Sequence, residues 1–434
     1  MVPGETPTKA MEAGPSPVVL TTDTPARSEA QNEEAKEVPA MRTVALDLGV
    51  RKICLCEVSD GAVVRRVTAR SLKDLDPLLG EGTAPARVAF EACREAWHVH
   101  DVLKARGHMP ILIDTTRVQR IGVGQHGAKT DRRDAEVLAR ALERGDIPVA
   151  HVLSTARRHM RDELCTRGAM VETRAQYITT LRGLARAHGV MLPSCSAEAF
   201  VKRVRGAALP PELLLCIEPV LGVMDALESR LAEVETRLET LARGAPEVAL
   251  LATVPGVGLI VAATFVAALD DAGRFPDAHA VEAYLGLVPC ENSSGGRRRL
   301  GAITKQGNPW ARNALVQAAH VILRTAPDDD PLKVWALTVQ ERRGKMIAVI
   351  ALARRLAGVL WAMWRRRRSY DPCRLAARSA AGLEQASEEK ARQADEQSAI
   401  ARAEHKIFPR TRARRGVKSP RSRGVASTEE VTGR

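Results

Sequence analysis

The sequence predicts an α/β domain at residues 41–150, a helical arm at residues 151–245 and a mostly helical domain at residues 246–375. The first region alternates between short apolar runs and amphipathic stretches, as strands and helices do in turn. The second region repeats apolar residues at heptad spacing. The third joins apolar helical runs through glycine-rich turns.

The first region reads as three antiparallel strands followed by alternating strands and helices. "RTVALDLG" and "KICLCEV" are predicted as buried strands, "SDG" as a tight turn and "AVVRRVTA" as the third strand. "ARVAFEA" and "MPILID" follow as short strands, separated by the helical stretch "EAWHVHDVLKARG". "DRRDAEVLARALERGD" is an amphipathic helix with Asp131 as its N-cap. This order predicts an RNase H-like (RuvC-like) fold.

The arm carries a seam of apolar residues at steps of four and three, namely Val220, Met224, Leu227, Leu231, Val234, Leu238 and Leu241. Such a heptad seam predicts a coiled-coil arm, and such arms often mediate dimerisation. A single long helix that packs on its own domain is the alternative interpretation.

The C-terminal domain opens with "LATVPGVGLIVAATFVAAL", two apolar helical runs around "VPGVG". This pattern predicts a helix-hairpin-helix, in which Gly256 and Gly258 let backbone N–H groups and a helix N-terminus approach a DNA phosphate. The alternative is an ordinary turn between helices that needs glycine at its cap.

The composition indicates a polyanionic partner. The chain has 434 residues and a formal net charge of +13, with an isoelectric point near 9.7. Aromatic residues make up only 3% of the sequence, which favours phosphate neutralisation by arginine over base stacking. The eight cysteines form no CxxC pair, so neither a zinc site nor a disulfide framework is indicated.

Both ends are predicted to be disordered. Residues 1–40 hold six prolines and seven acids but no aromatic residue. Residues 376–434 form a basic tail whose stretch "KIFPRTRARRGVKSPRSR" has eight bases and no acid. This tail either binds polyphosphate or is simply solvated. No eighteen-residue apolar span and no signal-peptide core are recognised, so we expect a soluble, cytoplasmic protein without a membrane segment.

Four carboxylates stand where the predicted fold would bring them together. Asp47 lies in the first strand, Glu91 ends the fourth, and Asp131 and Asp134 share one face of a helix. Four acids at one sheet edge repel one another unless cations neutralise them, and oxygen ligands select Mg²⁺ or Mn²⁺. Two such ions stabilise the attacking and leaving oxygens of a phosphodiester displacement.

Taken alone, each acid has a simpler explanation. "DLG" is also the phosphate-binding turn of actin-like ATPases and sugar kinases. Glu91 alone reads as a surface acid and Asp131 as a helix cap. The remaining acids of this region are interpreted as bystanders: Asp60 in a turn, Asp101 on a helix surface and Asp114 at a strand end.

The stretch "SSGGRRRLGAITKQGN", residues 293–308, is a glycine-rich and arginine-rich loop. Its glycines permit close backbone approach, and its basic residues would clamp a phosphate, namely Arg297, Arg298, Arg299 and Lys305. Next to a metal site, Ser294 could attack a phosphorus atom. The alternative is a phosphate-gripping loop in which both serines only donate hydrogen bonds.

Several motifs together resemble one family. "ALDLG", "FEA", "KTDRRDAEVLA", "VPGVG", "AYLGLVP", "SSGG", "RLGAITKQGN" and "LVQAA" are similar, in order and spacing, to the DEDD transposases of the insertion sequence 110 family, which include the Piv-like DNA invertases. The resemblance covers residues 42–370 and includes the helix "GKMIAVIALARRLAGVLWAM". Residues 365–368, "RRRR", and the tail beyond them look lineage-specific.

The resemblance implies the roles of the site residues. Asp47, Glu91, Asp131 and Asp134 match the family's metal-binding acids, and Ser294 matches its nucleophile, with Ser293 as the neighbouring alternative. It further implies a homo-oligomer in which the serine of one subunit completes the carboxylate site of another, and a guide non-coding RNA that pairs with DNA.

We therefore predict a transposase that recombines DNA at specific sites. The nearest alternative is a metal-dependent, structure-specific nuclease of the RuvC-like type, which would hydrolyse DNA with the four acids and no serine. An actin-like ATPase would need a second phosphate loop, which is not evident. A nucleic-acid-binding relic with a decayed site is the non-enzymatic alternative.

Overall fold

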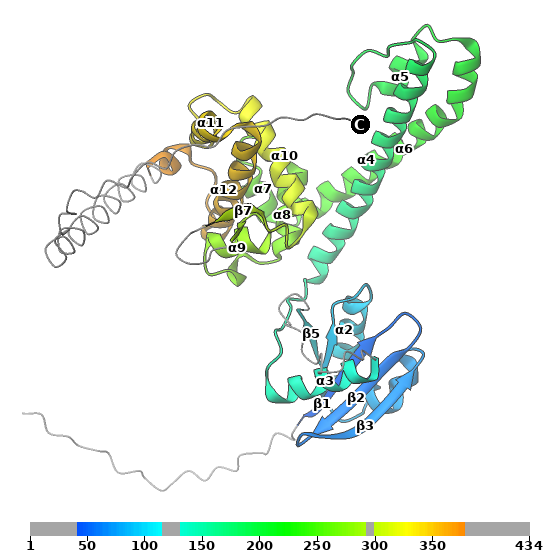
Figure 1. The fold of residues 1–434 in the computed structure, drawn as a ribbon, viewed down its shortest axis with the longest axis vertical. Coiled ribbons are helices and arrows are strands. Elements are labelled where there is room, and N and C mark those ends of the chain that lie inside the picture. The colour runs from blue at the N-terminus through cyan, green and yellow to red at the C-terminus, as the bar shows by residue number, and fades with distance from the viewer. Residues whose placement is uncertain (1–40, 115–130, 292–298, 378–434) are drawn as a thin grey trace, which may run out of the picture. The chain divides into compact units, whose positions relative to one another are not determined.

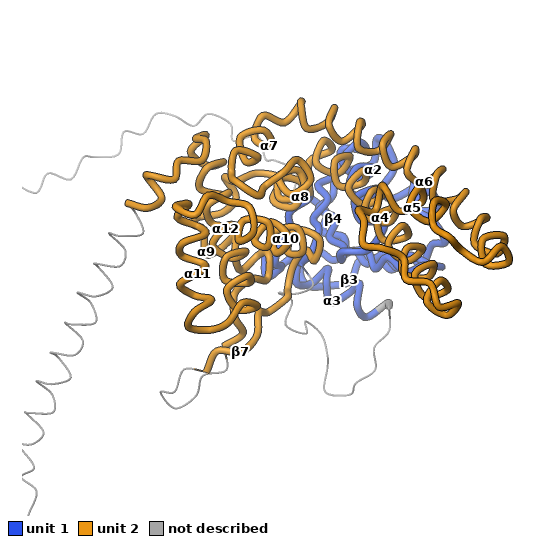
Figure 2. The backbone as a smooth tube through the Cα atoms, turned by 90° about the horizontal axis from the view of Figure 1, so that it is seen from above, with its two compact units in different colours: residues 1–152 blue, residues 153–434 orange. Residues whose placement is uncertain are grey.

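The computed structural model describes residues 41–114, 131–291 and 299–377. The chain divides into two compact units, residues 1–152 and residues 153–434 (Figure 2). The predicted terminal segments lie outside the described residues, apart from residues 376 and 377. Each unit is described by itself.

Unit 1 is built on a five-stranded mixed sheet with the strand order β3-β2-β1-β4-β5 (Figure 1). Its strands are β1 (Arg42–Leu48), β2 (Ile53–Ser59), β3 (Ala62–Ala69), β4 (Ala86–Glu91) and β5 (Met109–Ile113). The first three strands pair antiparallel, whereas β4 runs parallel to β1 and β5 runs parallel to β4. The central strand β1 therefore has a hydrogen-bonded neighbour on each side.

Helices cover both faces of this sheet. One face packs against α2 (Ala96–Ala105) and the short segments η1 (Lys73–Leu75) and α1 (Asp76–Leu79), around a cluster that includes Val44, Leu46, Val88, Phe90, Val99 and Leu103. The other face packs against α3 (Asp131–Arg144), around Ala45, Cys54, Ala89, Ile111, Ala135, Leu138, Ala139 and Leu142. Successive strand residues thus alternate between the two clusters.

The five strands and two of the helices of unit 1 confirm the sequence-based elements, with ends that differ by one or two residues. The segments η1 and α1 were not predicted, because seven residues give too short a pattern to show a helical period. A mixed α/β sheet domain ahead of a largely helical region agrees with the predicted fold class at this level. The assignment to the RNase H-like class stays a prediction.

Unit 2 begins with an antiparallel pair of 33-residue helices, α4 (Thr155–Ala187) and α6 (Pro211–Arg243), joined through α5 (Phe200–Arg205). Ion pairs show the direction, because later positions in α4 meet earlier positions in α6, as in Glu163–Arg237, Arg167–Glu235 and Arg174–Glu228. The seam residues Met224, Leu231, Val234 and Leu238 are buried. The predicted seam is therefore covered within the chain, as the alternative interpretation expected, and a coiled coil between chains stays a prediction.

The rest of unit 2 is a helical body around the almost fully buried helix α8 (Leu259–Leu269). It further comprises α7 (Pro246–Leu251), η2 (Ala272–Arg274), α9 (Ala278–Tyr284), β6 (Pro289–Glu291), β7 (Leu300–Ile303), α10 (Pro309–Thr325), α11 (Pro331–Arg343) and α12 (Lys345–Arg366). The core of this body also includes Met160 and Leu164 of α4 and Val234 and Leu238 of α6. The base of the helical arm and the body are thus one packed structure.

Among the described helices, α12 is the one long and apolar enough to cross a membrane, with 22 residues and a hydropathy of 1.7 over its most apolar window. The sequence-based expectation that no such span exists was wrong in this respect. Half of that window is buried inside the protein, where α12 packs against α9, α10 and α11. The apolar composition of α12 is therefore explained by its place in a core, which needs the same side chains as a membrane span.

An ion pair between Arg42 and Glu57 links β1 to β2. Arg42 Nε donates to Glu57 Oε1 at 2.6 Å and Nη2 to Oε2 at 3.1 Å, while Nη1 donates to the Leu78 carbonyl at 2.9 Å. Glu57 is 8% exposed. The hydrogen bonds from Arg42 hold the pKa of the Glu57 carboxyl below its usual range.

A carboxyl whose pKa is lower in the folded than in the unfolded chain adds stability above the unfolded pKa, near 4.3, and that stability is lost as pH falls through the folded pKa. We expect Glu57→Gln to lower the free energy of unfolding at pH 7 by about 2–3 kcal/mol. The difference from wild type should shrink as the pH falls below about 4. Urea unfolding of the full chain between neutral and acid pH measures it. Glu81→Gln, at an exposed acid of the same unit, is the control, and a pH-independent difference would contradict the assignment.

Candidate active site

Two of the predicted acids lie side by side at the carboxyl edge of the unit 1 sheet. Asp47 is the last but one residue of β1 and Glu91 ends β4, and these strands run parallel with Leu46 opposite Phe90. Along β1, Asp47 alternates onto the face of Ala45, and along β4, Glu91 alternates onto the face of Ala89. Both carboxylates therefore belong to the sheet face that α3 covers.

The direction of α3 brings its N-terminal end to the same edge. Near its C-terminal end, Arg140 Nη1 donates to the Gly61 carbonyl at 2.6 Å and Glu143 accepts from the Gly61 N–H at 3.1 Å. Gly61 lies in the turn between β2 and β3, next to the start of β1, so α3 runs antiparallel to β1. The helix therefore begins, at Asp131, toward the carboxyl ends of β1 and β4.

Helical spacing places Asp134 on the sheet-facing side of α3, because it precedes the buried Leu138 by one turn. Asp47 and Asp134 are partly buried, whereas Glu91 is exposed. Asp114 follows the last residue of β5, and strand alternation from Leu112 would put it on the opposite sheet face, as expected for a bystander.

The donor chemistry of this edge suits a hard divalent cation, because carboxylate oxygens are the ligands that Mg²⁺ and Mn²⁺ prefer. Among the side chains that the structure describes, which do not include that of Asp131, no group of three or more potential ligands is close enough to hold a metal ion. The metal centre therefore stays a prediction that rests on four acids at one edge.

The serine loop is carried by a short β-hairpin in unit 2. Strands β6 and β7 pair antiparallel, with Pro289 opposite Ile303 and Glu291 opposite Leu300. The connecting residues 292–298 lie outside the described residues, and with them Ser293, Ser294, Arg297 and Arg298. Arg299 and Lys305 flank β7 and are both exposed, so two of the four predicted phosphate-binding side chains are open to solvent beside the hairpin.

The base of this hairpin is fixed by a close crossing of two backbone segments. A Cβ atom on Gly286 would lie 2.1 Å from the Gln306 carbonyl oxygen, and one on Gly307 would lie 2.0 Å from the Tyr284 carbonyl oxygen. Both glycines have positive φ angles, 69° and 111°. Only glycine fits at either position. The segment after β7 is further tied down where the Lys305 N–H donates to the Gly286 carbonyl at 3.1 Å.

The residues that follow Gly307 attach this backbone crossing to α10 through hydrogen bonds. The Asn308 side chain caps this helix by accepting from the N–H groups of Trp310 and Ala311 at 2.9 and 3.3 Å. Arg312 Nη1 donates back to the Leu285 carbonyl at 2.9 Å. The glycines in "AYLGLVP" and "TKQGN" and the capping asparagine thus position the hairpin. This structural role of the motifs was not predicted from the sequence, although paired glycines beside strands were the available signal.

The predicted helix-hairpin-helix corresponds to α7, the turn at residues 252–258, and α8. A Cβ on Gly256 would lie 2.8 Å from Ile322 Cγ1 and 3.0 Å from Ile322 N, so this glycine is required by packing against α10. Gly258 is the N-cap of α8, is exposed, and has open space where a Cβ would stand. Packing and a positive φ angle of 80° both require glycine at position 256, and phosphate contacts at Gly256 and Gly258 stay predictions.

Residues 248–332, which contain α8, the hairpin and α10, match the family model "Transposase IS116/IS110/IS902 family". A probable family 20 transposase of Pseudomonas aeruginosa is 29% identical over 66% of this chain and 86% of its own length. The transposase for insertion sequence element IS1111A of Coxiella burnetii is 26% identical over 65% of this chain and 79% of its own. The transposase for IS1328 of Yersinia enterocolitica is 25% identical over 75% and 97%.

These matches identify the protein as a transposase. Its sequence is similar to the IS116/IS110/IS902 transposase family, as the sequence motifs indicated.

Gly286→Ala should destabilise unit 2 by about 3 kcal/mol or more, because the new methyl group would clash with backbone and the left-handed conformation would be strained. The matched control is Gly301→Ala in the same hairpin, where a Cβ would lie no closer than 3.7 Å to its neighbours. That change should stay within about 0.5 kcal/mol. The midpoints of thermal unfolding of the two full-length variants are compared. Equal midpoints would show that the backbone crossing at Gly286 does not require glycine.

Proposed function

We propose that the protein moves its insertion sequence by site-specific DNA recombination, in which Ser294 attacks a DNA phosphodiester at a divalent-metal site. The metal ligands would be Asp47, Glu91, Asp131 and Asp134. The observation that carries this proposal is that the acids of β1 and β4 and the first turn of α3 belong to one edge and one face of the sheet. Similarity to a transposase family supports it.

The strand order and directions of unit 1 also support the RuvC-like assignment, since three antiparallel strands are followed by two parallel ones. When bound, Mg²⁺ or Mn²⁺ would neutralise the acids and stabilise the attacking and leaving oxygens. The exposed position of Glu91 and the partial burial of Asp47 leave the site open to a large substrate.

In the proposed step, a bond forms between Ser294 Oγ and phosphorus, and the bond from phosphorus to a deoxyribose oxygen breaks. The serine hydroxyl loses its proton and the departing oxygen gains one. The resulting serine–DNA ester keeps the energy of the broken bond, so attack by another deoxyribose hydroxyl rejoins the strand and releases the serine. Arg299 and Lys305, exposed beside β7, would hold phosphates together with Arg297 and Arg298.

We further propose a homo-oligomer that works with a guide non-coding RNA. The predicted nucleophile and the predicted metal ligands belong to different compact units, so a site completed by a second copy is compatible with the chain's organisation. The net charge of +13 favours a polyanionic partner, whether DNA, RNA or both.

The serine mechanism predicts a covalent protein–DNA adduct. Purified full-length protein, DNA carrying the ends of its element, co-expressed upstream RNA and Mg²⁺ should give a protease-sensitive adduct. Ser294→Ala should abolish this adduct, while the matched variant Ser293→Ala should retain it. Cleavage without any adduct would instead favour the hydrolytic nuclease, and loss of the adduct only in Ser293→Ala would move the nucleophile by one residue.

The metal site predicts that Asp47→Asn and Asp131→Ala lower the recombination rate by on the order of a hundredfold or more. Asp60→Asn is the matched control, because Asp60 lies in the β2–β3 turn at the opposite end of the sheet. DNA binding by all three variants should stay close to wild type, and chelation of divalent ions by EDTA should abolish recombination. Robust recombination by Asp47→Asn or by the chelated protein would exclude this metal site.

A further inference from the structure

A cavity of about 1060 Å³ lies beside the C-terminal half of α12, between α9, α11 and the segment that follows α12. Small residues on α12, among them Ala351, Gly358 and Ala362, leave the space open. Its volume is at the upper end of the range of roughly 300–1,000 Å³ in which small-molecule sites usually fall. None of the predicted site residues lines it.

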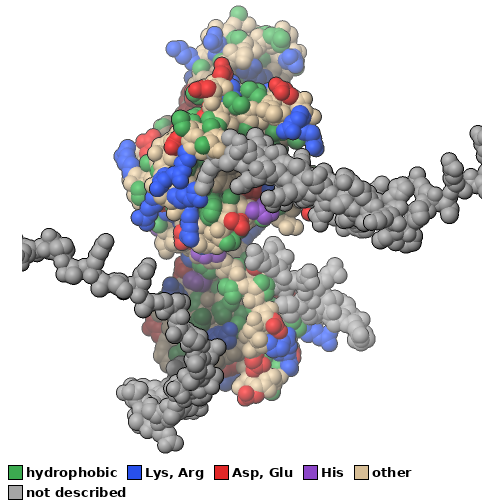
Figure 3. All heavy atoms as spheres, turned by 90° about the vertical axis from the view of Figure 1, so that its left-hand side faces the viewer, with side chains coloured by type: hydrophobic (Ala, Val, Ile, Leu, Met, Phe, Trp, Pro, Cys, Tyr) green, Lys and Arg blue, Asp and Glu red, His purple; other side chains and the backbone are tan. Residues whose placement is uncertain are grey.

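The walls of this cavity are strongly basic. Six arginines line it, against two carboxylates, Glu282 and Asp371: Arg354, Arg355, Arg366, Arg367, Arg368 and Arg374. Arg354 is neutralised, since its Nε donates to Glu282 Oε2 at 2.5 Å. Within the described parts of the chain, no carboxylate pairs with the three consecutive arginines 366–368. Figure 3 shows Lys and Arg side chains gathered on one face of the helical body of unit 2.

Aromatic residues gather at the same place. The chain has only five tryptophans and three tyrosines, yet Trp335, Trp361 and Tyr370 all line this cavity. The Trp361 indole N–H donates to the Ala272 carbonyl at 3.0 Å, and the Tyr370 hydroxyl donates to Asp330 Oδ2 at 2.9 Å. Both rings are thus held in place, so the aromatic walls of the cavity are preorganised.

The Arg355 guanidinium stacks on the Trp335 ring, 4.6 Å from its centroid. Burial lowers the pKa of the Arg355 guanidinium. Arginines at the end of α12 are favoured by the helix dipole alone, but the dipole does not explain a hollow lined by a stacked arginine–tryptophan pair. Positive charge beside flat aromatic walls fits a phosphate attached to a planar base.

We propose that this cavity binds an unpaired nucleotide of the nucleic acid on which the transposase acts, with its phosphates at Arg366 and Arg368 and its base against Trp335 and Arg355. The inference rests on the proposed action on nucleic acid but not on the serine or metal chemistry. An unpaired base is required because a base inside a duplex keeps its faces stacked on its neighbours. Single-stranded DNA and RNA share this chemistry.

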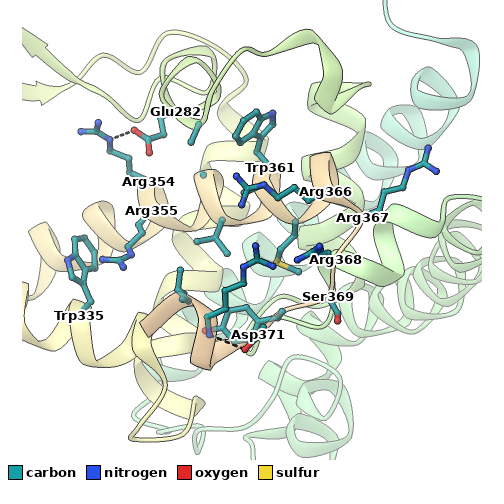
Figure 4. Close-up of a pocket in the computed structure, with 18 of the residues that line it drawn as sticks. Glu282, Trp335, Arg354, Arg355, Trp361, Arg366, Arg367, Arg368, Ser369 and Asp371 are labelled. Atoms are coloured by element: carbon teal, nitrogen blue, oxygen red, sulfur yellow. Dashed lines mark hydrogen bonds and ion pairs between the residues drawn. The ribbon is translucent and has the colours of Figure 1, made fainter. Parts of the chain in front are cut away.

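Figure 4 shows that Arg366 and Arg368 extend toward the same part of the cavity, whereas Arg367 points away from both. The double variants Arg366→Gln/Arg368→Gln and Arg342→Gln/Arg343→Gln remove the same charge, and Arg342 and Arg343 are exposed residues at the end of α11 that do not line the cavity. Trp335→Leu tests the stacking wall separately.

The experiment is a titration of the full-length variants with three fluorescein-labelled probes of one sequence: single-stranded DNA, single-stranded RNA and duplex DNA. We expect Arg366→Gln/Arg368→Gln and Trp335→Leu to weaken binding of a single-stranded probe about tenfold, with little change for the duplex. The control pair should change single-strand binding by less than about twofold. Thermal unfolding confirms that each variant is folded. A loss with the DNA strand identifies DNA as the source of the nucleotide, and a loss with the RNA strand identifies RNA.

Equal losses in the two double variants, or equal losses for duplex and single strands, would overturn the proposal, because both indicate general charge attraction. Unchanged binding in all variants would also overturn it, as would capture of a phosphopeptide in preference to the single strands. Failure of the wild-type protein to bind any of the three probes would instead count against the proposed function. The two failures are therefore distinguishable.

Discussion

Hydrogen bonding on both sides of β1 is the constraint on which unit 1 depends. Because β1 pairs antiparallel with β2 and parallel with β4, its register sets the register of both neighbours. A shift by one residue would turn Asp47 from the α3 face to the α2 face and bury it among leucines. The Arg42–Glu57 pair acts at the other end of the same two strands, where it resists such a shift.

The two units use different physical means to position their candidate residues. In unit 1 strand alternation and helical spacing assign Asp47, Glu91 and Asp134 to the sheet face that packs beneath α3. In unit 2 the β6–β7 hairpin depends on backbone geometry, because two glycines let the segments around Tyr284 and Gln306 pass so close that a Cβ atom would lie 2.0–2.1 Å from a carbonyl oxygen. The first arrangement tolerates changes among apolar residues, whereas the second tolerates almost none at its two glycines.

Much of unit 1 was predictable because its signals are local. Alternating apolar residues in "AVVRRVTA" and the periodic pattern after Asp131 each identify one element without reference to the rest of the chain. The seam on α6 shows the limit, since a heptad pattern identifies an apolar stripe but not whether the partner belongs to the same chain. The same holds for Gly256, whose role depends on Ile322, far away in sequence. The aromatic content shows a further limit, because a sequence average conceals the gathering of Trp335, Trp361 and Tyr370 around one cavity.

The helical arm has two apolar clusters with a polar stretch between them. The outer cluster joins Leu181, Phe200 and Leu213, and the inner one joins Leu164 to Leu238. Between them, the helices are bridged by pairs such as Arg174–Glu228 and Arg167–Glu235, whose attraction weakens as ionic strength rises. The middle of the arm therefore depends on these ion pairs as well as on the buried Leu231, so a rise in ionic strength would weaken this section more than the two apolar ends.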